Sequence, residues 1–174
     1  MNEVMCLAED LNIPIYYQDT DSMHVEEKYL TKLEKEYFKK YNRVLRGTNL
    51  GQFHPDFDSK KLVGDLVSVE SYFLGKKAYC DKLASDTFGH WFNILTGEVD
   101  YDHHLRMKGI PNDLLGSEYE DPLDLYKRLY EGEPYKFNLL KLKPSFEMTK
   151  ECTIKTRTEF NRQISFTSEK GVLN

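Results

Sequence analysis

Residues 13–25 read IPIYYQDTDSMHV, a stretch that sets two aspartates, Asp19 and Asp21, one residue apart directly behind an apolar run. The segments 13–17 and 22–26 are expected to form two strands joined by the turn QDTD, because Asp and Thr serve turns well. A carboxylate that is buried without a partner costs several kcal/mol or takes up a proton. We therefore expect a positive partner beside the pair: a basic side chain, a helix N-terminus or a metal ion.

Helical periodicity flanks this hairpin on both sides. Residues 2–11 are expected to form a short helix, and residues 29–45 a longer one. The apolar stripe of the second helix consists of Leu30, Leu33, Tyr37 and Tyr41. Its other face is rich in lysine and is expected to face water. Residues 46–57 contain Gly, Asn and Pro and are expected to form a loop.

From residue 61 to 110 the sequence predicts a strand meander. The expected strands are LVGDLVSVESYFLG (62–75), KKAYCDKL (76–83), HWFNIL (90–95) and VDYDHHLRMKG (99–109). A helical turn after Pro111 and a helix opened by Asp121-Pro122 follow, the latter with Asp as N-cap and Pro in the first turn. Residues 151–160 alternate as a strand does. The predicted class is α+β, an antiparallel sheet with packed helices up to residue 109 and a smaller α+β region after it.

Composition limits the classes of protein. Hydrophobic residues make up 40% of the 174 residues and aromatic residues 13%, which is typical of a folded chain. No run approaches the about 18 apolar residues of a membrane span, and no secretory signal is visible at the start. The three scattered cysteines, Cys6, Cys80 and Cys152, lack CxxC spacing and indicate reduced thiols in an intracellular compartment, without zinc.

Charge is distributed unevenly along the chain. The formal net charge is −5, which argues against a protein that only coats nucleic acid. Residues 1–31 carry seven acidic residues and one lysine, whereas residues 136–170 carry eight Lys or Arg and four Glu. Such a division would suit a metal-dependent enzyme acting on a polyanion, although charge-rich sequences also produce it by chance.

Two readings of the Asp-Thr-Asp tip remain open from the residues alone. A tight hairpin can bring both carboxylates onto one Mg²⁺, a hard cation that usually completes its shell with water and substrate phosphates. Alternatively, both aspartates cap backbone N–H groups of an ordinary turn. A calcium loop does not fit, because the sixth position lacks the glycine of that motif.

The flanking residues favour the first reading. Tyr17-Gln18-Asp19-Thr20-Asp21-Ser22, between apolar strands, resembles the YxDTDS element of family B DNA polymerases, the palm hairpin called motif C. The aromatic residue, both acids, the threonine and the serine all match. The resemblance implies that Asp21 binds the metal ions and that Asp19 supports the site. It also implies that Thr20 shapes the turn and that Tyr17 and Ser22 complete the motif structurally.

Two further segments match the same family in the same order. Lys77-Ala78-Tyr79 resembles the KxY element that holds the primer end, and RMKGIP (106–111) is similar to the KG element where palm passes into thumb. Lys108 would then touch the primer backbone. The intervening LGQFHPDF (50–57) looks like a segment of the protein-primed subgroup, the viral, linear-plasmid and mobile-element polymerases.

The resemblance implies a DNA-directed DNA polymerase that uses Mg²⁺ or Mn²⁺ to join a primer 3′-hydroxyl to a deoxynucleoside triphosphate. Residues 1–109 would be part of a palm and residues 110–174 a thumb. The implied partners are primer–template DNA, deoxynucleoside triphosphates, the remainder of the polymerase and, in protein-primed members, a terminal protein; no membrane is involved.

Other family elements are missing from the sequence. Neither the DxxSLYP-like element of the palm nor the KxxxNxxYG-like element of the fingers occurs. We therefore expect the C-terminal part of a polymerase, inactive by itself. The alternative is a standalone, non-catalytic remnant that still binds primer–template DNA.

Overall fold

All paired strands that the structure describes run antiparallel, and helices pack beside them, which confirms the predicted α+β class. The computed structural model describes residues 1–85, 100–117, 119–139, 144–158 and 162–166. Contacts divide the chain into unit 1, Met1–Lys60, and unit 2, Lys61–Asn174. The boundary predicted between palm and thumb, after residue 109, lies within unit 2 and stays a prediction.

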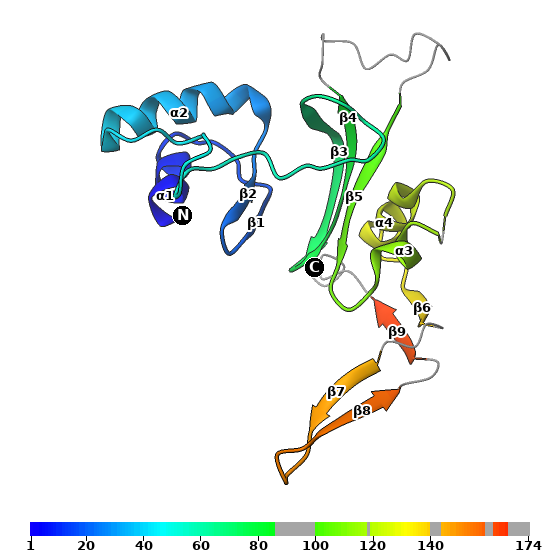
Figure 1. The fold of residues 1–174 in the computed structure, drawn as a ribbon. Coiled ribbons are helices and arrows are strands. Elements are labelled where there is room, and N and C mark those ends of the chain that lie inside the picture. Colours follow the sequence, from blue (N-terminus) through cyan, green and yellow to red (C-terminus); the bar gives the residue numbers. More distant parts are fainter. Residues whose placement is uncertain (86–99, 118, 140–143, 159–161, 167–174) are drawn as a thin grey trace. The chain divides into compact units, whose positions relative to one another are not determined.

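Unit 1 consists of two helices and the expected hairpin (Figure 1). Helix α1 spans Asn2–Asp10 and α2 spans Glu27–Tyr41, while β1 (Tyr17–Asp19) pairs with β2 (Ser22–His24). The core consists of Val4, Leu7, Ala8, Ile13, Leu33, Tyr37 and Leu45. Two members of the predicted α2 stripe, Leu33 and Tyr37, are therefore buried.

The hairpin and α2 are both shorter than the sequence predicted. Residues 13–16 lie outside β1, consistent with Pro14, which has no N–H to donate to a strand ladder. Helix α2 ends four residues early because Asn42 adopts a left-handed conformation, φ 51°, and its N–H bonds the Phe38 carbonyl. The chain then turns back, so that Leu45 reaches the core from a loop and its carbonyl accepts from the N–H of Phe53, 2.9 Å away.

Unit 2 is built on a three-stranded sheet in the order β3-β4-β5. Strand β3 spans Leu66–Gly75, β4 spans Ala78–Ser85 and β5 spans Asp102–Met107, in agreement with three of the four predicted strands. The fourth, at 90–95, lies outside the described residues. β4 is central, and its residues alternate between a face that packs on helices and an opposite face.

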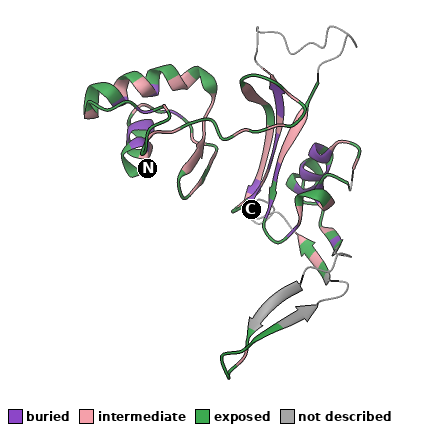
Figure 2. Cartoon of the chain, in the orientation of Figure 1, coloured by how far each residue is buried: buried purple, intermediate pink, exposed green. Residues whose placement is uncertain are grey.

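Two short helices cover one face of this sheet. Helix α3 spans Asn112–Leu115 and α4 spans Pro122–Tyr130, as the sequence predicted. The core beneath them includes Leu74, Ala78, Cys80, Leu105, Met107, Leu115, Leu125, Tyr126, Leu129 and Phe137. Figure 2 shows the buried residues of unit 2 gathered on β4 and α4. The Tyr126 hydroxyl donates to the Arg106 carbonyl at 2.9 Å, which fastens α4 to β5.

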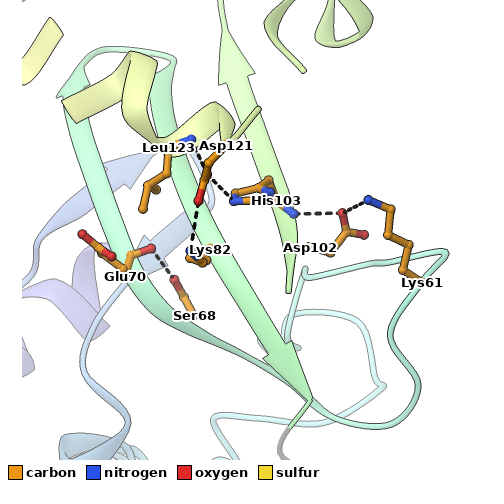
Figure 3. Close-up of polar contacts among 8 residues, drawn as sticks. All are labelled: Lys61, Ser68, Glu70, Lys82, Asp102, His103, Asp121 and Leu123. Carbon is orange, nitrogen blue, oxygen red and sulfur yellow. Dashed lines mark hydrogen bonds and ion pairs between the residues drawn. The ribbon is translucent and has the colours of Figure 1, made fainter. Parts of the chain in front are cut away.

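Asp121 joins the start of α4 to the sheet (Figure 3). Its carboxylate accepts from the Leu123 N–H at 2.9 Å and lies 3.0 Å from both Lys82 Nζ and His103 Nε2. Burial opposes ionisation of Asp121, but the Leu123 N–H and Lys82 outweigh it and lower the pKa of the carboxyl. Burial also lowers the pKa of His103. The N-cap predicted from Asp121-Pro122 is therefore confirmed and has two further partners.

The described residues of unit 2 that follow α4 include two pairs of strands. Strand β6 (Tyr135–Leu139) pairs with β9 (Arg162–Phe166), and β7 (Pro144–Met148) pairs with β8 (Ile154–Thr158). The strand predicted from residue 151 begins three residues later, because Cys152 has φ 59° and forms part of the turn.

Two expectations from composition can be compared with the described residues. Of the cysteines, Cys80 is buried while Cys6 and Cys152 are exposed, and all three are free thiols. No helix in the described part of the chain has the length and apolar character needed to cross a bilayer.

Replacing Asp121 by Ala should lower the free energy of unfolding by about 1 to 2 kcal/mol, since it removes the cap of α4 and leaves Lys82 and His103 without this carboxylate. Asp121→Asn, which can still cap, should lose less. Urea denaturation measures both. Asp124→Ala, which removes an exposed acid from the same first turn, is the matched control. Equal losses in Asp121→Ala and Asp124→Ala would contradict this role.

Stability should also fall on mild acidification. The contribution of a neutral, half-buried His103 is complete above the unfolded-state pKa of about 6.5 and is lost as the pH falls from there through the lower pKa of the folded state. Asp121 adds a loss in the same direction below about pH 3.9. Melting temperatures between pH 8 and 5 should drop less in His103→Gln than in the wild type. Exposed His54→Gln should follow the wild-type profile, and a profile unchanged in His103→Gln would refute the assignment.

Candidate functional site

The acidic hairpin, residues 17–24, carries the two candidate metal ligands on a tight turn. Asp19 pairs with Ser22 in the ladder, which leaves only Thr20 and Asp21 in the loop. At the open end of the hairpin the rings of Tyr17 and His24 meet edge to face, 5.5 Å apart, and His24 lies 6.3 Å from Phe57. Aromatic contacts therefore fix the base of the hairpin, and its tip is formed by the Asp-Thr-Asp residues.

The two aspartates have different surroundings. Asp19 is half-buried; its carboxylate accepts from the Thr20 hydroxyl at 3.3 Å, and its backbone carbonyl accepts from the Ser22 hydroxyl at 3.1 Å. Asp21 is exposed at the tip. Both hydroxyls therefore bond to Asp19 within the turn, while the roles inferred for Thr20, shaping the turn, and for Ser22, completing the motif, stay predictions. The exposed position of Asp21 suits a residue that must reach a ligand.

Thr20 has a backbone conformation that its side chain disfavours. Its φ is 51°, in the left-handed region that Gly and Asn adopt readily and β-branched residues rarely do. In unit 1 the other non-glycine positions with positive φ, Asn12 and Asn42, are both asparagine. Strained backbone of this kind concentrates at functional sites. Thr20 therefore adopts an unfavourable backbone conformation at the tip.

Asp19 and Asp21 can supply two carboxylates to a hard divalent ion. Among the described residues, no group of three or more His, Cys, Asp or Glu side chains gathers as a metal site would require. Mg²⁺ is commonly held by one or two carboxylates together with water and substrate phosphates, so a pair at an exposed tip fits that donor set.

The basic end of the sheet, defined by Lys76, Lys77, Arg106 and Lys108, brings two other candidate segments together. Lys76 and Lys77 form the two-residue turn between β3 and β4, where Gly75 pairs with Ala78. The Lys108 N–H donates to the Lys77 carbonyl at 3.0 Å. Lys77 and Lys108, predicted from two separate segments, are therefore neighbours. Lys77 has φ 58°, a second uncommon left-handed position at a candidate site.

Tyr79 lies in a row of side chains across the sheet. It pairs with Phe73 on β3 and with Arg106 on β5, and the rings of Phe73 and Tyr79 lie 6.2 Å apart. The row is on the face opposite to Ala78 and Cys80, which pack on the helices. Phe73 and Arg106 were not singled out from the sequence. The alternation Leu105-Arg106-Met107 is a signal that could have placed Arg106 away from the core, but only the register aligns it with Tyr79.

A buried carboxylate underlies the same face. Asp81 is fully buried; Ser71 donates to it at 2.6 Å and Ser68 at 3.4 Å, while His104 Nδ1 lies 3.6 Å away. The His104 ring meets Tyr79 edge to face at 5.7 Å. The Asp81 carboxylate and the His104 ring therefore lie beside Tyr79 on the same face of the sheet. The sequence did not point to this carboxylate, because Asp81 lies in a predicted strand and belongs to no motif.

The candidate residues thus form two groups. Lys77, Tyr79 and Lys108 lie together at one end of the sheet of unit 2, whereas Asp19 and Asp21 lie on the acidic hairpin of unit 1. All members of each group belong to the same unit. The roles inferred for the five residues stay predictions.

Comparisons with protein-family models, with curated proteins and with solved structures returned no match to this chain. The likeness to family B polymerases therefore rests on the residues of the acidic hairpin, the Lys-x-Tyr segment and the Lys-Gly segment.

Exchanging residues between two left-handed positions of unit 1 tests whether the hairpin tip is strained. Thr20→Asn should raise the free energy of unfolding by about 0.5 to 1 kcal/mol, because Asn tolerates this backbone conformation better than a β-branched residue. The reciprocal control, Asn42→Thr at the end of α2, should lower it by a similar amount. Thermal and urea unfolding measure both. A destabilised Thr20→Asn would show that Thr20 is there for stability.

Proposed function

We propose that this chain is the C-terminal part of a DNA-directed DNA polymerase of family B, most similar to its protein-primed subgroup. In this proposal the acidic hairpin and the β3-β4-β5 sheet belong to the palm. Asp21 and Asp19 hold Mg²⁺ or Mn²⁺, and Lys77, Tyr79 and Lys108 grip the primer strand. The thumb lies beyond residue 109.

One observation carries the proposal. The Lys-x-Tyr and Lys-Gly segments, both matched to the same family, lie about thirty residues apart in the sequence, and the 3.0 Å bond from the Lys108 N–H to the Lys77 carbonyl makes them neighbours. A shared primer-binding role requires this proximity, whereas two chance matches do not. An ammonium group can bind a phosphate and an aromatic ring can pack against a sugar or base, which are the contacts that a primer end offers.

The acidic hairpin supports the catalytic half of the proposal. Two carboxylates on a hairpin tip can hold a metal that the phosphates of an incoming nucleotide help to coordinate. The chemistry supplied by bound Mg²⁺ would be activation of the primer 3′-hydroxyl and neutralisation of charge on the reacting phosphate. The left-handed Thr20 between the acids is consistent with a site selected for function.

A non-catalytic DNA-binding remnant is the second candidate. The basic end of the sheet is sufficient by itself for contact with a strand, and it lies in a different unit from the acids. This candidate makes no use of Asp19 and Asp21, which would repel phosphate if no metal were bound. Both candidates predict that the chain alone does not extend a primer, since the upstream palm and fingers elements are absent from its sequence.

Binding to primer–template DNA with and without Mg²⁺ separates the two candidates. For the polymerase fragment, Mg²⁺ should tighten binding of a fluorescein-labelled duplex with a recessed 3′ end, and Asp21→Asn should abolish that gain. For the remnant, Asp21→Asn should tighten binding without metal, because it removes a repelling charge, and Mg²⁺ should add nothing specific.

Matched controls keep this experiment specific. Asp10→Asn, which removes an acid from the same unit outside the hairpin, should leave the effect of Mg²⁺ unchanged. Lys77→Ala should weaken binding about tenfold, the size of one charge-assisted contact, whereas exposed Lys127→Ala on α4 should not. A wild-type chain without affinity for DNA would overturn both candidates.

A further inference from the structure

The sheet face beside the Lys76-Lys77 turn combines aromatic and cationic side chains in one row. Phe73, Tyr79 and Arg106 stand opposite one another on β3, β4 and β5. Directly opposed residues on neighbouring strands point to the same face, and strands are spaced by about 4.8 Å. The row therefore spans two strand spacings, from the Phe73 ring on β3 to the Arg106 guanidinium group on β5.

Charge on this end of the sheet is of one sign. Residues 72–80 and 105–111 contain four Lys or Arg and no Asp or Glu, in a chain whose net charge is −5. The register of β3-β4-β5 and the bond from the Lys108 N–H to the Lys77 carbonyl bring these two segments together. Two acidic residues elsewhere in unit 2, Asp81 and Asp121, are engaged by Ser71 and by Lys82.

Contacts of the Arg106 backbone and of its strand neighbours fix the position of this residue. Its carbonyl accepts from the Tyr126 hydroxyl at 2.9 Å, and its strand neighbours Leu105 and Met107 are buried in the core. The backbone of Arg106 is therefore fixed on both sides, while its side chain is exposed. A guanidinium on a fixed backbone loses less conformational entropy when it binds phosphate bidentately than a lysine on a free loop does.

From these observations we propose that Arg106 is a phosphate-binding residue, and that Phe73, Tyr79 and Arg106 form a track for one polynucleotide strand crossing β3, β4 and β5. Arg106 holds a backbone phosphate, and the two rings contact sugar or base. This inference rests on the proposed function, since it requires a nucleic-acid ligand, and it adds two residues that the sequence motifs do not contain.

The alternative is that Arg106 is an ordinary solvated charge. Strand β5 is the last strand of the described sheet, and exposed edge strands often carry charges that prevent pairing with other chains. A residue with that role would be indifferent to DNA. The two explanations therefore differ in binding affinity and in its dependence on salt.

The test measures affinity for the labelled primer–template duplex at several salt concentrations. Arg106→Ala should weaken binding about tenfold near 0.1 M salt and reduce the slope of log K against log salt by about 0.8, the loss of one phosphate contact. Arg106→Lys should keep the slope and recover part of the affinity. Phe73→Leu should weaken binding with the slope unchanged, because stacking releases no counterions.

The controls separate failure of this inference from failure of the proposed function. Lys127→Ala, on the helix that covers the opposite face, should change affinity less than twofold. If the wild type binds and Lys77→Ala weakens binding, but Arg106→Ala behaves as Lys127→Ala does, Arg106 is a solvated charge and only this inference fails. Displacement of DNA by polyglutamate at equal charge would also overturn it, since the face would then recognise charge alone. A wild type that does not bind overturns both.

Discussion

Burial of one face of the β3-β4-β5 sheet is the constraint on which the rest of unit 2 depends. Ala78, Cys80 and Leu105 must face α4 to exclude water, and a slip of one residue in register would send them to the opposite face. The same constraint orients every residue between them. Tyr79 and Arg106 face away from the helices because their neighbours are buried, so hydrophobic packing on one side determines which polar groups the other side presents.

In unit 1, too, the residues that stabilise the fold are different from the residues that are exposed at the candidate site. Its apolar residues, drawn from α1, α2 and a returning loop, form a core that leaves the tip of the acidic hairpin outside. The tip can then hold a left-handed Thr20, whose cost is of the order of 1 kcal/mol, because the core supports the flanking strands. Lys77 shows the same pattern in unit 2, where a paired hairpin fixes an unfavourable turn residue. Each unit thus has one residue singled out for function in this uncommon conformation, which Asn12, Asn42 and Cys152 also adopt.

Sequence reasoning succeeded where a local rule decides the structure. Asp121-Pro122 predicted the start of α4, and apolar flanks around Asp-Thr-Asp predicted a hairpin. It failed where a local left-handed turn overrides the hydrophobic pattern: Asn42 ended α2 early although the helical periodicity continued to Leu45, and Cys152 delayed a strand that alternated well. Within the candidate sites, Lys77 and Lys108 were identified by motif resemblance, but the resemblance could not predict that they are in contact. Arg106 needed the strand register, and Asp81 needed knowledge of what buries it, neither of which a single sequence contains.

The bond between Lys108 and Lys77 also bears on the order of folding. Strands β3 and β4 are joined by a two-residue turn, so their pairing is local and closes quickly, within microseconds for hairpins in general. Pairing of β5 with β4 joins Tyr79 to Arg106 across 27 positions and must overcome the entropy of closing that loop. Non-local strand pairing of this kind is the slow step in sheet proteins. We therefore expect Phe73 and Tyr79 to come together before Arg106 and Lys108 join them, so that the mixed aromatic and cationic surface exists only once β5 has docked.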